Sequence, residues 1–267
     1  MPLFHLLLLA VIQGVTEFLP VSSSGHLALY PRLTNVQDQG LALDVAVHVG
    51  SLLAVILYFW KDVKLAMGGL IRLARGKIDT QGAFLALCLV VSTIPVVAVG
   101  FVLYITGWSD ALRSMAVIGW AMLIFGVVLY WADRSGGTER IAARWTLKDA
   151  AVMGLAQVLA LIPGTSRSGI TITAARKLGY DRESSARLAM LMSIPTIVAS
   201  GVLLVGDAVD HADVHLLRDA TIAAAFSFLS ALLALAFMMR LLKAVSYTPY
   251  VIYRCVFGIV LLVIAYS

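Results

Sequence analysis

The chain has 267 residues, of which 61% are hydrophobic and only 13% are charged, whereas soluble domains carry about 25% charged residues. This composition excludes a soluble globular domain and indicates an integral membrane protein. The net charge of +5 does not indicate nucleic-acid binding, because the basic residues lie in the gaps between apolar segments, where membrane topology accounts for them.

The first apolar segment covers residues 3–21 and runs directly into a polar motif, Glu17-Phe-Leu-Pro-Val-Ser-Ser-Ser-Gly-His26. A helix needs about 20 apolar residues to cross the hydrocarbon core, and this segment is interrupted before it reaches that length. We therefore expect it to be re-entrant. Because no basic leader precedes it, we expect no cleaved signal peptide.

Six later segments are long and apolar enough to span the bilayer. They cover residues 41–60, 82–105, 112–131, 186–205, 220–240 and 249–266. Between the third and the fourth, residues 149–163 form a second short apolar segment, which runs into a second polar motif, Pro163-Gly-Thr-Ser-Arg-Ser-Gly169. Basic gaps flank this segment on both sides, so it must enter and leave the membrane on one side. We expect it to be re-entrant as well.

The basic residues set the predicted orientation, because cytoplasmic loops carry an excess of Lys and Arg. We assign to the cytoplasm the basic gaps at residues 61–81, 132–148 and 174–187 and the turn with Arg240 and Lys243. The more acidic loops and both termini are assigned to the opposite side. The acidic residues of these loops are Asp110, Asp207, Asp210, Asp213 and Asp219.

The predicted fold is an all-α polytopic membrane protein with a single domain over residues 1–267. One re-entrant segment followed by three spans occurs twice, in repeats of about 1–135 and 146–267. Three crossings per repeat force the two halves into inverted orientations. Residues 13–25 and 157–169 share Gln, Ser, Ser and Gly at an offset of 144. A competing match between Ile94-Pro95 and Ile194-Pro195 has an offset of 100 and contradicts that register.

Glu17 and Arg167 are the two charges placed deepest in the polar motifs. A charge at the membrane centre costs roughly 2.5 to 3.5 kcal/mol on insertion scales, so it is normally paired, hydrated or functional. One interpretation is a salt bridge that locks the two halves together. The other is an anion site, because the planar guanidinium of Arg167 can give two parallel hydrogen bonds to phosphate oxygens.

The residues around Arg167 favour the anion site. Gly164 and Gly169 would let the backbone approach a ligand closely. If a helix begins after Gly169, then Ser166, Ser168 and the free backbone amides would face an anion. An ordinary polar turn at the cytoplasmic interface is the alternative.

The first motif combines hydroxyls with an imidazole. Ser22 and Ser23 lie four and three residues before His26, so either could share a helical face with it. This spacing suits a hydroxyl nucleophile deprotonated by a neighbouring base; alternatively, Ser22 is a helix N-cap and His26 an interfacial histidine. Glu17 could hold a divalent cation or act as a general base, and the sequence does not separate these roles.

Three polar residues within the spans are weaker candidates. Asp44 and His48 lie one helical turn apart near the outer interface, where we expect simple hydration rather than a proton or metal role. Arg254 lies near the cytoplasmic end of the last span, and we expect its side chain to reach toward the interface.

Together, Gln13-x-x-x-Glu17, the motif that continues to His26 and the motif Pro163–Gly169 resemble the undecaprenyl pyrophosphate phosphatase family, the BacA or UppP bacitracin-resistance proteins. The resemblance covers the whole chain. It implies a bacterial inner-membrane enzyme that removes the terminal phosphate from undecaprenyl diphosphate and regenerates the monophosphate carrier for cell-wall synthesis. It also implies re-entrant helices in an inverted repeat, an active site open to the periplasm, and stimulation by Mg²⁺ or Ca²⁺.

The resemblance also implies roles for individual residues. Glu17 corresponds to the essential carboxylate, Ser23 to the proposed nucleophile, His26 to the family's histidine, and Ser166 with Arg167 to the phosphate-binding pair. Ser22, Ser24, Ser168, Gly164 and Gly169 complete the predicted phosphate site. The metal ligands would be Glu17 and Gln13, although Gln13 stands where the family can have a second carboxylate.

Two questions stay open at the level of sequence. A phosphoseryl intermediate on Ser23 and direct attack by water activated by Glu17 and His26 are equally compatible with the residues. A polyprenyl-phosphate flippase or an anion-coupled transporter would also suit an inverted repeat with an anion site at the midplane. A homodimer is left open as well.

Overall fold

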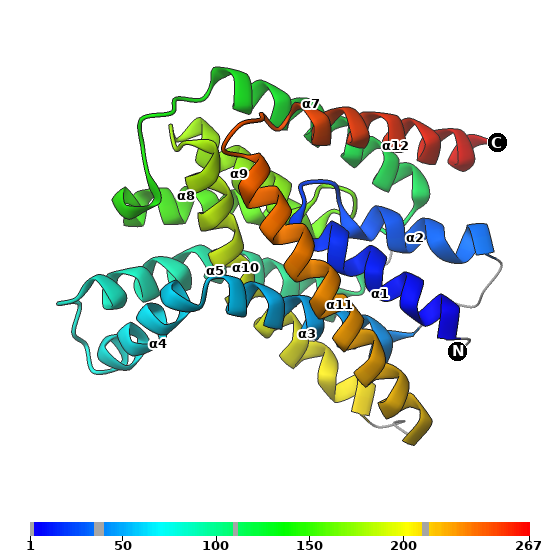
Figure 1. The fold of residues 1–267 in the computed structure, drawn as a ribbon, viewed down its shortest axis with the longest axis horizontal. Coiled ribbons are helices and arrows are strands. Elements are labelled where there is room, and N and C mark those ends of the chain that lie inside the picture. Colours follow the sequence, from blue (N-terminus) through cyan, green and yellow to red (C-terminus); the bar gives the residue numbers. More distant parts are fainter. Residues whose placement is uncertain (1–2, 35–39, 109–111, 210–213) are drawn as a thin grey trace.

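The computed structural model describes residues 3–34, 40–108, 112–209 and 214–267, and these ranges contain helices and no strand. Figure 1 shows the helices as an elongated bundle. Asp110, Asp210 and Asp213, which were predicted to lie in the outer loops, fall outside the described residues.

Six long apolar helices confirm the six predicted spans within a few residues at each end. They are α3 (Leu41–Tyr58), α5 (Gln81–Thr106), α7 (Met115–Ser135), α10 (Arg182–Val209), α11 (Val214–Leu241) and α12 (Thr248–Tyr266). Hydroxyl caps set two of the boundaries, because the side chains of Thr80 and Ser114 accept hydrogen bonds from the first-turn amides of α5 and α7.

Two pairs of shorter helices surround the polar motifs. The first pair is α1 (Leu3–Phe18) and α2 (Ser23–Thr34); the second is α8 (Leu147–Val158) and α9 (Arg167–Lys177), joined through the 3₁₀ turn η2 (Leu159–Leu161). At 1.5 Å per residue none of the four is long enough to cross a bilayer alone. Each pair packs as a hairpin, with α1 against α2 and α8 against α9.

The first basic gap contains a helix that was not predicted, α4 (Trp60–Ala74), which packs against α5. The two helices come close because Gly69 and Gly82 have no side chains: a Cβ on Gly69 would lie 2.0 Å from the backbone of Gly82. The opposite side of α4 exposes apolar side chains, including Met67 and Ile71. A second short turn, η1 (Ala142–Arg144), lies in the next basic gap.

The long helices hold both hairpins through small-residue contacts. Helix α11 packs against α1 and α3, helix α8 packs against α5, and α12 packs against α7. Gly14 of α1 faces the backbone of Ser227 in α11, and Gly154 of α8 faces the backbone of Ser92 in α5. Such close approach is typical of helix pairs in membranes, where van der Waals packing replaces the hydrophobic effect.

Polar contacts gather the four segments predicted to be cytoplasmic at one end of the molecule. Arg187 of α10 pairs with Asp62 of α4 at 2.5 Å. The buried carboxylate of Asp133 pairs with Arg182 at 2.8 Å and accepts a hydrogen bond from the backbone amide of Tyr247 at 3.2 Å. The start of α1 and the end of α12 lie at the other end (Figure 1).

Candidate active site

The loops of the two hairpins meet in the middle of the molecule (Figure 1). Gly164 donates its backbone N–H to the Ser24 hydroxyl at 3.0 Å, and the Ser168 hydroxyl donates to the backbone carbonyl of Leu19 at 3.0 Å. Each loop is therefore held by a serine of the other motif. This reciprocal contact joins segments about 140 residues apart in the chain.

The two hairpins begin their second helices in the same way. Ser22 precedes α2 with a φ of 72°, and Ser166 precedes α9 with a φ of 68°. Among the described residues, these are the two non-glycine residues with a positive φ. Such a conformation costs of order 1–3 kcal/mol, and residues that adopt it cluster at functional sites. Ser22 contacts the Ser24 hydroxyl at 3.0 Å, and Ser166 contacts the Ser168 hydroxyl at 3.1 Å. The two turns thus correspond at the sequence offset of 144 residues and not at the competing offset of 100.

Glu17 lies in the last turn of α1 with its side chain only 7% exposed. Its Oε1 accepts a hydrogen bond from Nη2 of Arg167 at 2.6 Å. Its Oε2 accepts from the amide nitrogen of Gln13 at 2.8 Å and from the hydroxyl of Ser23 at 2.9 Å. The structure thus brings the two deep charges together and places the predicted nucleophile on the same carboxylate.

Arg167 is the first residue of α9, and one side of its guanidinium has no partner among the residues that the structure describes. Nη2 binds Glu17, whereas Nη1 is buried and has no hydrogen-bond partner among the described residues. A buried donor left unsatisfied costs about 1–3 kcal/mol, more for a charged group. Ser166 caps the same helix by accepting from the Gly169 amide at 3.1 Å. The start of α9 therefore offers a cationic donor and free helix amides to an anion.

A cavity of about 800 Å³ opens beside this cluster, a size within the usual range for small-molecule sites. The polar side chains of both motifs line one part of it, and mainly apolar residues of α3, α5 and α10 line the rest, together with polar residues that include Arg113 and Thr196. The motif residues that line it are Glu17, Ser22, Ser23, Ser24, Ser166 and Arg167. A site with a charged polar part and apolar walls suits a ligand that combines a phosphate with a lipid chain.

Two residues of α3 that sequence reasoning ranked low also line the cavity. Nδ1 of His48 contacts the backbone carbonyl of Asp44 at 2.7 Å, which fixes a proton on that nitrogen. Nε2 points toward Glu17 and lies 3.8 Å from its Oε2. This distance is too long for a direct hydrogen bond but suits a bridging water. The signal in the sequence was the i, i+4 spacing of an acid and an imidazole inside an apolar span.

The structure does not bring His26 to Ser23. Nδ1 of His26 contacts the backbone carbonyl of Ser22 at 2.8 Å, and Nε2 contacts the hydroxyl of Tyr253 at 2.6 Å. The ring also stacks on Phe257, with the centroids 4.5 Å apart. Because α2 turns this face toward α12, His26 supports the loop, and Glu17 is the titratable side chain that contacts Ser23.

Three residues predicted to bind phosphate lie in the second loop and the first turn of α9 and do not line the cavity. Gly164 has a φ of 93°, and a Cβ there would lie 2.4 Å from the backbone oxygen of Ile118. Gly169 gives its amide to Ser166. The Ser168 hydroxyl is occupied by Leu19 and Ser166. These residues shape the backbone around Arg167.

Gln13 and Glu17 do not fit a protein-made cation site in this arrangement. Gln13 presents its amide nitrogen to Glu17, and the carboxylate already receives hydrogen bonds from Arg167, Gln13 and Ser23. Among the described residues no group of three or more His, Cys, Asp or Glu side chains could hold a metal ion. Hard cations need several oxygen ligands. A carboxylate that already accepts three hydrogen bonds, with the buried Oε1 of Gln13 that has no partner among the described residues, does not provide enough of them.

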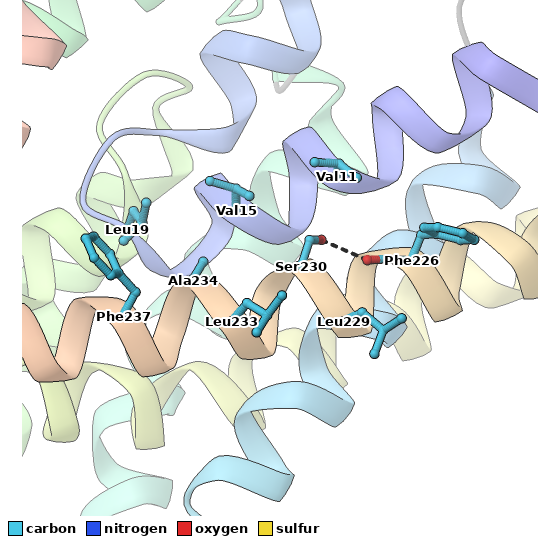
Figure 2. A pocket seen from close by; sticks show the side chains of 9 residues that line it. All are labelled: Val11, Val15, Leu19, Phe226, Leu229, Ser230, Leu233, Ala234 and Phe237. Atoms are coloured by element: carbon cyan, nitrogen blue, oxygen red, sulfur yellow. Dashed lines mark hydrogen bonds between the residues drawn. The ribbon is translucent and has the colours of Figure 1, made fainter.

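A second hollow, of about 700 Å³, lies between α1 and α11 (Figure 2). Its residues are Val11, Val15, Leu19, Phe226, Leu229, Ser230, Leu233, Ala234 and Phe237. The hydroxyl of Ser230 is used within α11, where it donates to the carbonyl of Phe226 at 2.8 Å (Figure 2). With no charged or titratable side chain, this groove is not the reaction site.

The fold and the site define a multi-pass membrane protein with a buried carboxylate–guanidinium pair at the edge of an internal cavity. The sequence matches the family described as "Bacitracin resistance protein BacA" over residues 6–260, and the chain belongs to this family.

Three relatives are similar over essentially their full length. The undecaprenyl-diphosphatase of Roseobacter denitrificans is 68% identical over all of both chains, and that of Jannaschia sp. is 64% identical over all of both chains. The undecaprenyl-diphosphatase of Chromohalobacter salexigens is 44% identical over 97% of both chains.

Proposed function

We propose that this chain is an undecaprenyl diphosphatase, a membrane hydrolase that removes the terminal phosphate of undecaprenyl diphosphate. The product is the monophosphate carrier of cell-wall synthesis, and the activity confers bacitracin resistance. Relatives with 62–68% identity over the whole chain carry this name. The observation that carries the proposal for this chain is the position of Nη1 of Arg167. It is buried at the edge of the cavity, beside Glu17 and Ser23, and has no hydrogen-bond partner among the described residues.

In this proposal the terminal phosphate binds to Nη1 of Arg167 and to the amides at the start of α9. Phosphoryl transfer depends mainly on positioning and on neutralising the charge that spreads over the phosphoryl oxygens. A guanidinium held on one side by Glu17 is oriented before the substrate arrives. Binding of the phosphate would weaken the pull of Arg167 on Glu17 and so make the carboxylate a better base.

Ser23 is the proposed nucleophile, and Glu17 is its proposed base because their side chains are 2.9 Å apart. The Ser23 Oγ–P bond forms, the bridging P–O bond breaks, and the proton passes through Glu17 to the departing phosphate oxygen. Undecaprenyl phosphate leaves, and water then cleaves the phosphoserine and releases inorganic phosphate. His26 keeps an indirect role through the Ser22 carbonyl.

Direct attack by water is the second mechanism that the geometry supports. A water beside the pair formed by Nε2 of His48 and Oε2 of Glu17, which lie 3.8 Å apart, would find an acceptor on each of them. In this version Ser23 only orients Glu17. Arg167 keeps the same task in both versions.

We propose an inverted repeat in which both hairpins are re-entrant. The positive φ that Ser22 and Ser166 share supports it. So do the helix contacts, because the first helix of each hairpin packs against the second span of the other repeat: α1 against α11, and α8 against α5. The clustering of the basic segments at one end supports a cytoplasmic assignment for that end. The termini and the mouth of the site would then face the periplasm across a bacterial inner membrane.

A transporter or flippase is the alternative from another class. Purified protein in detergent separates the two, because an enzyme releases inorganic phosphate from undecaprenyl diphosphate without a closed membrane, whereas a transporter alone releases none. We propose that a divalent cation, Mg²⁺ or Ca²⁺, assists turnover as a complex with the diphosphate. Addition of a chelator to the same assay tests this, with loss of turnover expected and full recovery on adding the cation back.

A further inference from the structure

Arg254 of α12 has no exposed surface, although the sequence predicted that its side chain would reach the interface. It forms no ion pair with any residue that the structure describes. A buried charge without a counter-ion is costly, so its hydrogen bonds must compensate. The expectation of an interfacial side chain was therefore wrong, and the reason is a set of backbone acceptors inside the bundle.

The guanidinium of Arg254 donates to backbone carbonyls of three separate segments. Nη2 donates to the carbonyls of Gly164 at 3.1 Å and Thr165 at 2.9 Å. Nη1 donates to the carbonyl of Pro20 at 3.3 Å, and Nε donates to that of Met122 in α7 at 3.3 Å. One side chain thus bridges both hairpin loops and a spanning helix.

The bridged carbonyls lie next to the reacting groups. Thr165 immediately precedes the strained Ser166, which starts the helix that presents Arg167. Pro20 lies two residues before the strained Ser22, which precedes Ser23. A guanidinium that holds both of these loops fixes the distance between the phosphate-binding group and the nucleophile.

We propose that Arg254 is a positioning residue that clamps the two loops of the active site together. An arginine is required because its rigid fork of five donors can reach three backbone segments at once, whereas a lysine offers one compact ammonium group. Two glycines make space for the Arg254 side chain because any larger residue would crowd it. A Cβ on Gly169 would lie 2.8 Å from Nη1 of Arg254, and a Cβ on Gly126 would lie 3.4 Å from the Cβ of Arg254.

This inference rests on the proposed phosphatase function. A misplacement of about 1 Å in a reacting group can lower a rate about 100-fold. Loosening of both loops should therefore reduce turnover far more than it reduces the stability of the bundle. A role confined to packing would reduce both in proportion.

The test compares Arg254→Lys with Arg176→Lys in purified, detergent-solubilised protein. Arg176 is the matched control because it is also fully buried and donates to backbone carbonyls, but it lies at the basic end, paired with Asp133. For Arg254→Lys we expect kcat/KM to fall about 100-fold, with most of the loss in kcat, at a melting temperature no lower than that of Arg176→Lys. For Arg176→Lys we expect kcat/KM per folded molecule within about threefold of wild type.

A second readout does not need turnover. Inorganic pyrophosphate should raise the melting temperature of wild type and of Arg176→Lys, and should raise that of Arg254→Lys clearly less. The clamp is overturned if Arg254→Lys keeps wild-type kcat/KM and wild-type stabilisation by pyrophosphate, or if both variants lose activity in proportion to stability. A wild-type protein that is stabilised by pyrophosphate but releases no phosphate would instead overturn the proposed function.

Discussion

The hydroxyl of Ser23 and Nη2 of Arg167 bind opposite oxygens of one carboxylate, that of Glu17. A purely structural salt bridge would not need the hydroxyl, nor would it leave Nη1 of Arg167 buried without a partner. At this scale the site is a set of hydrogen-bond donors arranged around the Glu17 carboxylate, and Nη1 of Arg167 is left to bind a second anion. In the proposed function, this second anion is the phosphate of the substrate.

Ser23→Ala separates the two mechanisms. If Ser23 is the nucleophile, the variant loses at least about 1,000-fold in kcat, because the covalent step has no substitute. Single-turnover phosphate release measures this, with Ser230→Ala as the control because the Ser230 hydroxyl bonds within α11, away from the site. Residual turnover within about tenfold of wild type would favour direct attack by water.

At the scale of elements, the hairpins depend on backbone conformations that few residues tolerate. Gly164 and Gly107 both have a positive φ, but a Cβ on Gly107 would meet no atom of the described residues within 4 Å, whereas one on Gly164 would lie 2.4 Å from the backbone of Ile118. Substitutions at these two glycines therefore separate the cost of backbone strain from the cost of a clash with α7.

We expect Gly107→Ala to cost about 1 kcal/mol of stability from conformational strain alone. Gly164→Ala should cost about 1–3 kcal/mol more, because the clash forces the second loop away from α7, and phosphate release should fall with it. Thermal midpoints and turnover of the two variants provide the comparison. Equal effects would mean that the approach of this loop to α7 does not matter.

The N-terminus of α8 is fixed by a charge network outside the spans. Burial would raise the pKa of Asp149, but hydrogen bonds from Arg140, Thr146 and Tyr180 outweigh it and hold the pKa below its ordinary value. Because the folded state favours the carboxylate, this group stabilises the fold above the ordinary Asp pKa of about 3.9, and the contribution is lost as the pH falls below it.

Asp149→Asn should therefore lower the melting temperature by a few degrees at pH 7. The difference from wild type should shrink as the pH is lowered below about 4. Asp79→Asn is the control, since Asp79 pairs with Arg72 on the exposed surface, where screening leaves little effect. A difference that stays constant down to pH 3 would contradict the assigned ionisation.

At the scale of the whole molecule, the sequence was sufficient for the six spans, because length and hydropathy alone determine them. It also indicated that Glu17 and Arg167 would meet, because an unpaired charge deep in the membrane costs free energy. It did not predict the direction of His26 or the partners of Arg254, since hydropathy does not say which face of a helix meets which neighbour. Helix α4 was missed because its basic residues made the segment resemble a loop.

The central claim is that Arg167 binds the terminal phosphate of a polyprenyl diphosphate and that Glu17, beside it, acts as the base. Its most direct test is inorganic phosphate release from undecaprenyl diphosphate by the purified wild type, Arg167→Lys and Glu17→Gln, each confirmed to be folded by its melting curve. We predict release by the wild type and a loss of at least about 1,000-fold in kcat/KM for each variant, since each removes charge or bidentate geometry at the transferred group. Release by folded Arg167→Lys at the wild-type rate would contradict the claim.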